Sequence, residues 1–145
     1  MKISTRGRYG LRMLVDIAEN QGDGFVSLTD IAERQGISKK YLEQIVPGFT
    51  SAGILLAGRG HMGGYKLAKE PSAYSVADIL RVTEGKLAPV ACLEGDANLC
   101  ERADSCDTFF VWQGLMETIE SYLERITIRD ILFRKRRKQE DYVLL

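Results

Sequence analysis

The chain has 145 residues, of which 45% are hydrophobic and 28% charged, with 20 Lys and Arg against 20 Asp and Glu. This length excludes two large domains, and this balance of residues excludes wholesale disorder. The sequence has no run of roughly 18 apolar residues and no apolar N-terminal leader, so we expect a cytoplasmic protein with no membrane partner.

The zero net charge hides a segregation of charge along the chain. Residues 1–70 hold ten Lys and Arg against seven Asp and Glu, whereas residues 71–107 hold three against seven. A basic N-terminal part suits contact with phosphates, although an excess of three charges also fits an ordinary solvated surface. Charge alone therefore does not decide between these two interpretations.

Three helices are predicted in the first part of the chain. Apolar residues at three- and four-residue spacing predict a helix over residues 5–20, which the segment QGDG ends. Ser27 can cap a second helix, LTDIAERQ, and Gly36 ends it. Ser38 can cap a third, KKYLEQIVPGFTSAG, whose later turns Pro47 is expected to limit or bend.

A hairpin and further helices are predicted beyond these three. Residues 54–56 and 65–67 predict two short strands around a glycine-rich tip. Ser75 can cap a helix over VADILRVTEG. Dense apolar residues after position 108 predict a long helix with more than one apolar stripe, which favours packing against a second chain. Thr127 can cap a last segment, RDILFRKRRK, before a tail, QEDYVLL.

Helix, glycine turn, helix and hairpin follow the order of a winged helix-turn-helix, whose second helix enters the major groove of DNA. A carboxylate repels phosphate, so Glu43 is suited to accept a hydrogen bond from a cytosine amino group. The equally weighted alternative is that Glu43 is a solvated helix residue without a DNA contact. An arginine in the wing suits a narrow minor groove, whereas a tight turn without partners is the alternative for the hairpin. The candidate DNA contacts are Ser38, Lys39, Lys40, Glu43, Arg59 and His61.

A second group of candidate functional residues consists of Cys92, Cys100 and Cys106, spaced Cys-x7-Cys-x5-Cys. Three soft donors on one polar, irregular segment favour ligation of an iron-sulfur cluster or zinc over burial as small hydrophobic side chains. The spacing matches neither zinc ribbons nor ferredoxins, and three cysteines do not suit a disulfide framework. Without a fourth cysteine, the fourth ligand stays open among Asp or Glu oxygens, a partner residue and a small molecule.

The segments MKISTRGRYGLRMLVDIA, SKKYLEQIV and GRGHMGGYKLA, together with the three cysteines, resemble the Rrf2 family of bacterial transcriptional regulators, in particular its cluster-binding branch. The resemblance implies a mostly α fold, with a winged helix-turn-helix, a small β-hairpin wing and a long C-terminal dimerisation helix. It implies base reading by Ser38, Lys40 and Glu43, a minor-groove contact by Arg59, and iron ligation by the cysteines. Phe109 stands where the cluster-biogenesis regulator of the family has a histidine ligand, so the cluster type stays open.

We therefore expect a DNA-binding domain over residues 1–84, a cluster-binding segment over 85–107, and a dimerisation helix with a tail over 108–145. The expected function is transcriptional regulation by a homodimer that binds double-stranded DNA under the control of an iron-sulfur cluster, with 2Fe-2S favoured over 4Fe-4S. One alternative is the same DNA binder without a cluster, controlled by thiol redox or a protein partner. Another is a zinc-binding or electron-transfer module. No nucleophile with a base and no phosphate loop is found, so no enzyme is expected.

Overall fold

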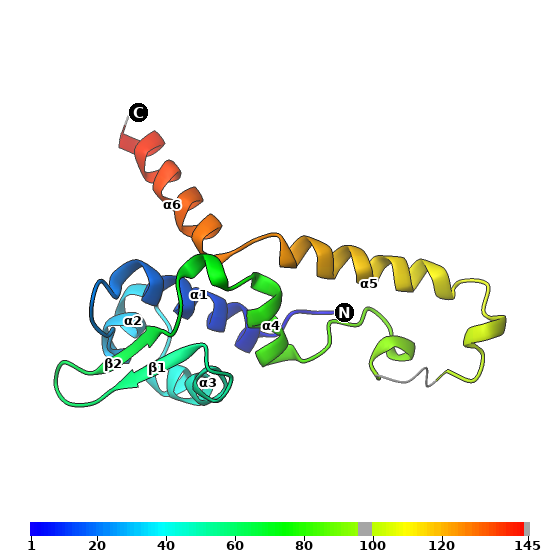
Figure 1. The fold of residues 1–145 in the computed structure, drawn as a ribbon, viewed down its shortest axis with the longest axis horizontal. Coiled ribbons are helices and arrows are strands. Elements are labelled where there is room, and N and C mark those ends of the chain that lie inside the picture. The colour runs from blue at the N-terminus through cyan, green and yellow to red at the C-terminus, as the bar shows by residue number, and fades with distance from the viewer. Residues whose placement is uncertain (96–99, 144–145) are drawn as a thin grey trace.

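The computed structural model describes residues 1–95 and 100–143 (Figure 1). Its order of helices and hairpin confirms the order predicted from the sequence. The helices and strands are α1 (Thr5–Asn20), α2 (Leu28–Gln35), α3 (Lys39–Ser51), β1 (Leu55–Gly58), β2 (Gly64–Leu67), α4 (Val76–Glu84), α5 (Phe109–Glu124) and α6 (Ile128–Val143). Short 3-10 turns lie at Pro71–Ala73, Ala91–Leu93 and Ala103–Ser105.

Serine side chains start the helices where the sequence predicts them. The hydroxyl oxygens of Ser27 and Ser38 accept from backbone N–H groups three residues later, at 3.2 and 3.1 Å. Ser75 and Asp78 form a reciprocal capping box at the start of α4. Gly36, in the left-handed region with φ 63°, ends α2. These caps satisfy N–H groups that have no partner inside the helix, and thereby fix the helix boundaries.

The first core forms around α1, which packs against α2, α3, α4, β2 and α6. Gly10 lets α1 and α3 approach closely, because a Cβ at this position would lie 3.0 Å from the Phe49 ring. The start of α6 belongs to the same core through Ile128 and Leu132. The fully buried side chains at its centre are Met13, Leu14, Ile17, Ile31, Leu42, Ile45, Phe49 and Ile79.

Two helix ends can be compared with the expectations. First, α3 ends at Ser51, within the predicted segment, and it continues through Pro47, although proline lacks the N–H group that would bond four residues back. Burial of Val46 and Phe49 on the inner side of the helix offsets that loss. Second, the expectation of a tail is wrong for the segment QEDYV, because α6 continues to Val143. Gln and Glu are good helix formers, so the helix has no local reason to stop after the basic run.

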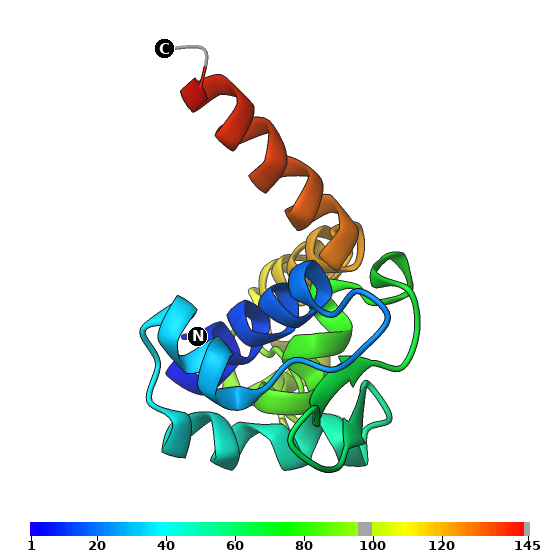
Figure 2. The ribbon, with the colours of Figure 1, turned by 90° about the vertical axis from the view of Figure 1, so that its left-hand side faces the viewer.

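The second half of α5 packs against α4, and the first half extends beyond the body of the molecule (Figure 1). Leu123 and Ile126 contact a small cluster formed by Val76, Leu80 and Leu87. Figure 2 shows α6 leaving the body on the side opposite α3 and the hairpin. Within residues 1–95 and 100–143, no helix combines the length and the hydropathy needed to cross a bilayer.

An ion pair between a buried carboxylate and a partly exposed guanidinium joins α1 to the end of α2. The Asp16 side chain is only 1% exposed, and it accepts from Nε and Nη2 of Arg34 at 3.0 and 2.7 Å. The side-chain amide of Gln35 donates to the same carboxylate at 2.9 Å. Because a bidentate guanidinium matches a carboxylate in geometry and charge, this pair fixes α2 against α1.

Replacing Arg34 with leucine is expected to lower the free energy of unfolding by about 3 kcal/mol, because the Asp16 carboxylate would stay buried without its counter-charge. Chemical denaturation monitored by circular dichroism measures the change. Lys135→Ala is the control, since the Glu19 carboxylate that it pairs with is not buried as Asp16 is, and this pair is expected to contribute less than about 1 kcal/mol. Equal effects of the two substitutions would contradict the assignment of a structural role to the buried pair.

Candidate DNA interface and cysteine segment

The first turns of α3 present a polar surface to solvent. Lys39, Lys40, Glu43 and Gln44 are exposed and lie on one stripe of the helix, because their spacing follows the helical repeat. No ion pair ties these side chains to another residue of the described part of the chain. Ser38 is also exposed, and its oxygen caps the helix while its hydroxyl proton remains available to an acceptor. This surface has the donors and the acceptor that a major-groove contact needs.

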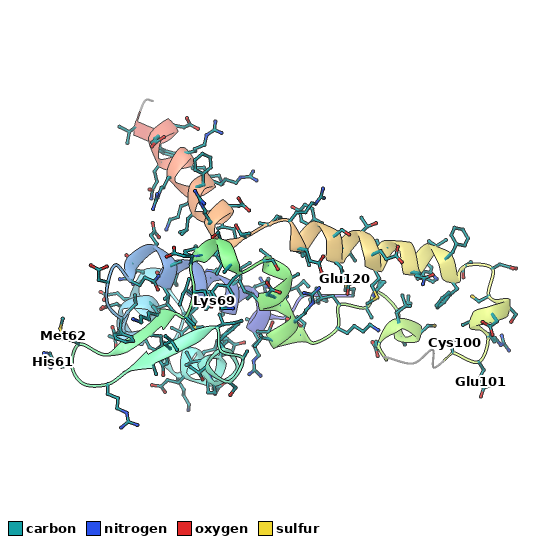
Figure 3. The ribbon with its side chains drawn as sticks, in the orientation of Figure 1. His61, Met62, Lys69, Cys100, Glu101 and Glu120 are labelled. Carbon is teal, nitrogen blue, oxygen red and sulfur yellow. The ribbon has the colours of Figure 1, made fainter. Side chains whose placement is uncertain are left out.

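The hairpin forms a wing on the same side of the molecule as α3 (Figure 2). Its strands pair antiparallel, with Leu55 opposite Leu67 and Gly58 opposite Gly64. Arg59 and His61 are exposed between the strands, and Figure 3 shows His61 pointing outward at the tip. The structure therefore brings all six predicted DNA-contacting residues to one side of the body, from two separate elements.

Two further residues hold the wing, and sequence reasoning missed both. Val26 forms a bridge with Tyr65, with both backbone hydrogen bonds at 2.8 Å. The ring of Phe25 lies against Gly58, where a Cβ would come within 2.8 Å, and Lys66 Nζ lies 5.0 Å from the ring centroid. The available signal was an aromatic residue followed by a β-branched one in the loop before α2. A single bridged residue is too short to be distinguished from a loop by periodicity.

Gly64→Ala is expected to distort the wing, since a Cβ at this position would lie 2.2 Å from the Val26 carbonyl oxygen and the φ of 145° disfavours a side chain. We expect a loss of about 2 kcal/mol in the free energy of unfolding. Thermal melting tests this against Gly24→Ala, whose nearest atom lies at 3.9 Å and which should change stability by less than about 0.5 kcal/mol. Similar melting temperatures for both variants would refute the close approach.

The cysteines lie on the segment between α4 and α5, and Cys100 lies at the end of the long axis opposite the wing tip (Figure 3). Cys92 and Cys100 are half-buried and Cys106 is exposed, and all three are free thiols. His61 is far from Cys100 in the same chain, so it does not supply a nitrogen donor to a site formed within one chain (Figure 3). Residues 96–99 of this segment lie outside the described residues.

The cysteine thiols differ in their electrostatic surroundings. The pKa of Cys92 is raised, first by hydrogen bonding with Cys100, then by desolvation and by repulsion from the Cys100 and Cys106 thiolates. The pKa of Cys106 is lowered, first by the Thr108 hydroxyl, whose oxygen lies 3.5 Å from Sγ, and then by backbone N–H groups. Cys106 therefore favours the thiolate form, which binds metals, whereas Cys92 favours the thiol.

The donor set fits an iron-sulfur cluster or zinc in its chemistry, because it supplies three soft thiols on one accessible segment. The thiols do not surround one point. Within residues 1–95 and 100–143, no group of three or more His, Cys, Asp or Glu side chains is close enough to hold a metal ion. Sites of this kind are rarely preformed, since ligand binding and local folding are coupled. Cys92, Cys100 and Cys106 are the residues that would hold the group, and a fourth donor is needed.

Comparison with known proteins identifies relatives over almost the whole chain. The model of the Rrf2 family, described as an iron-dependent transcriptional regulator, matches residues 3–134. The HTH-type transcriptional regulator CymR of Bacillus subtilis is 37% identical over 143 residues, which are 99% of this chain and 98% of that protein. IscR of Yersinia enterocolitica, also named an HTH-type transcriptional regulator, is 35% identical over 132 residues, which are 91% of this chain and 79% of that protein.

Solved structures agree with this assignment. The structure of CymR, the global cysteine regulator of B. subtilis, has a TM-score of 0.76 and covers 92% of this chain and 98% of that chain. The structure of T. potens IscR has a TM-score of 0.73 at 39% identity and covers 93% of this chain and 88% of that chain. These relatives are named as transcriptional regulators rather than enzymes, and they have the predicted winged-helix fold. The chain therefore belongs to the Rrf2 family of transcriptional regulators.

Proposed function

We propose that this regulator binds operator DNA as a homodimer, with α3 in the major groove and the wing over the adjacent minor groove. The exposed residues of α3 and Arg59 of the wing support this arrangement, since they lie on one side of the body and include donors for both bases and phosphates. In this proposal residues 1–84 form the DNA-binding unit, 85–107 the sensing segment and 108–145 the dimerisation unit.

A stripe of apolar side chains on α5 supports the homodimer. Val111, Leu115 and Tyr122 are 43%, 42% and 56% exposed, and with Thr118 they repeat at intervals of four and three residues. This is the spacing of a coiled-coil seam, and a second copy of α5 would bury it. Two copies packed in this way would present two α3 helices to successive half-sites of a pseudo-palindromic operator.

We propose that Cys92, Cys100 and Cys106 hold an iron-sulfur cluster, favoured as 2Fe-2S, which controls the affinity for operator DNA. The observation that carries this proposal is that three free thiols lie on the one segment that joins the DNA-binding body to α5. When bound, the cluster would supply a centre that responds to iron, oxygen or nitric oxide. Similarity to IscR and to a family described as iron-dependent supports it.

The start of the cysteine segment is tied to the DNA-binding body. Glu84, immediately before this segment, accepts from the backbone N–H of Ser4 at 3.1 Å and also from the Ser4 hydroxyl. Ser4 in turn caps α1 by accepting from Gly7 N–H at 3.0 Å. A change in the segment that moved Glu84 would therefore act on Ser4 and on the start of α1. Coupling by such a change commonly amounts to about 1–3 kcal/mol.

The three free thiols also suit a second candidate, in which the thiols themselves control DNA binding without a cluster. Similarity to CymR, named a global cysteine regulator, supports this alternative. The zinc or electron-transfer module without a DNA role loses support, because the relatives are transcriptional regulators.

Metal analysis of oxygen-free protein distinguishes these candidates. We expect about two iron atoms and two sulfides per chain, together with visible absorption that Cys106→Ala abolishes. Ser105→Ala is the matched control, since its hydroxyl donates only to the Arg102 carbonyl at 3.3 Å. Colourless, iron-poor protein whose DNA affinity responds to thiol alkylation would refute the cluster and favour thiol control.

A further inference from the structure

We propose that Arg12 is a positioning residue for sequence recognition, which sets the orientation of α3 without contacting DNA itself. The inference rests on the proposed function, because it assumes that α3 reads the operator. Arg12 lies on α1, outside the six candidate contacts, and it reaches both the end of α2 and, through two aromatic rings, the start of α3.

The guanidinium of Arg12 holds the turn between α2 and α3. Its Nε donates to Oε1 of Gln35 at 3.2 Å, and its Nη2 donates to the backbone carbonyl oxygen of Gln35. Gln35 is the last residue of α2, and its amide nitrogen donates to buried Asp16 at 2.9 Å. Both polar atoms of the Gln35 side-chain amide are therefore hydrogen-bonded, immediately before Gly36 turns the chain toward α3.

The same guanidinium is connected to the first turn of α3 through aromatic rings. Its Cζ lies 5.2 Å from the centroid of the Tyr9 ring, a cation-π distance. The Tyr9 ring meets the Tyr41 ring edge to face, with the centroids 5.7 Å apart and the planes at 84°. Tyr41 is the third residue of α3, next to Lys40 and two residues before Glu43. A change in this stack would move the turn that carries the proposed base contacts.

The chemistry of these contacts requires arginine. Parallel donation to a side-chain oxygen and a backbone oxygen of one residue uses the planar fork of a guanidinium, which also presents a flat face to Tyr9. An ammonium group has the same charge but cannot make this set of contacts. Arg12→Lys therefore distinguishes a phosphate contact from a positioning role. Lysine can replace arginine beside a phosphate, but it cannot make the contacts to both Gln35 oxygens and to the Tyr9 ring.

The test measures affinity for two duplexes, one selected from a randomised library by the unsubstituted protein and one of unrelated sequence. Arg12→Lys and Arg12→Gln are both expected to weaken binding to the selected duplex about tenfold, the equivalent of one poorly aligned base contact. Binding to the unrelated duplex and the dependence on salt are expected to stay unchanged. Tyr41→Phe keeps the ring edge and should bind like the unsubstituted protein. Arg81→Gln, which breaks the 2.6 Å bond from Arg81 Nη2 to Glu124, is the matched control away from α3.

Other results would contradict a positioning role for Arg12. If Arg12→Lys binds normally while Arg12→Gln weakens binding to both duplexes and lowers the salt slope by about two per dimer, Arg12 is a phosphate contact and the inference is wrong. Unchanged discrimination in both Arg12 variants also overturns it. If Arg12→Gln lowers the melting temperature strongly, the inference is tested by the affinity of the Arg12→Lys protein for the selected duplex. Failure of the unsubstituted protein to discriminate between duplexes would instead refute the proposed function.

Discussion

Leu115→Glu is expected to convert the homodimer into monomers and to weaken operator binding by about 100-fold, because the two half-sites would no longer be bound by one linked pair of domains. Leu115 is 42% exposed at the middle of the apolar stripe on α5, between Val111 and Tyr122. Two glutamates facing each other across a seam would lose apolar contact and repel each other. Analytical ultracentrifugation and duplex titration measure the two effects on the same preparation.

The control for this substitution lies on the same helix. Gln113 is exposed on the polar side of α5, away from the stripe, so Gln113→Glu adds the same charge without meeting the partner helix. It is expected to leave the dimer and the operator affinity unchanged. A Leu115→Glu protein that remains dimeric and binds operator normally would show that α5 is not the interface.

Arg59→Ala is expected to weaken operator binding by about 1–3 kcal/mol and to lower the slope of log affinity against log salt by about two, since each dimer would lose two cationic contacts in the minor groove. Arg59 is exposed directly after β1, in the wing, which lies on the same side of the body as α3. Fluorescence anisotropy at several salt concentrations measures both quantities.

Glu43→Gln provides the contrasting case for Arg59→Ala. A carboxylate that accepts from a cytosine amino group contributes discrimination rather than phosphate affinity, so we expect about tenfold weaker preference at one base pair per half-site and no loss in salt slope. Selection from a randomised library shows which base pair is affected. An unchanged preference would make Glu43 a solvated helix residue, the alternative that the sequence left open.

Much of the fold was predictable because its determinants are local. Ser38 and Ser75 cap the helices that follow them, and the wing turns at a run of glycines, so each boundary depends on only a few neighbouring residues. The end of α6 was mispredicted because no residue after the basic run stops a helix. Pro47 lies inside α3, as predicted, and buried core contacts from distant parts of the chain offset the backbone hydrogen bond that proline cannot make.

The residue types of the site were predictable from the sequence, but the contacts that hold these residues in place were not. Lys40 and Arg59 were identified from a familiar order of elements, and their exposure agrees with that role. The contact between Arg12 and Gln35 joins residues 23 positions apart, and the Asp16–Arg34 pair joins residues 18 apart. No periodic pattern encodes such pairings, because they depend on how helices pack in three dimensions.

The most direct test of the account is the affinity of one protein preparation for a selected duplex, measured without oxygen before and after iron is removed by a chelator. We expect the two affinities to differ by about tenfold, and we expect Cys106→Ala to show a single affinity equal to that of the iron-free protein. Equal affinities in an iron-loaded and an iron-free sample of the unsubstituted protein would contradict control of DNA binding by the cysteine segment through iron.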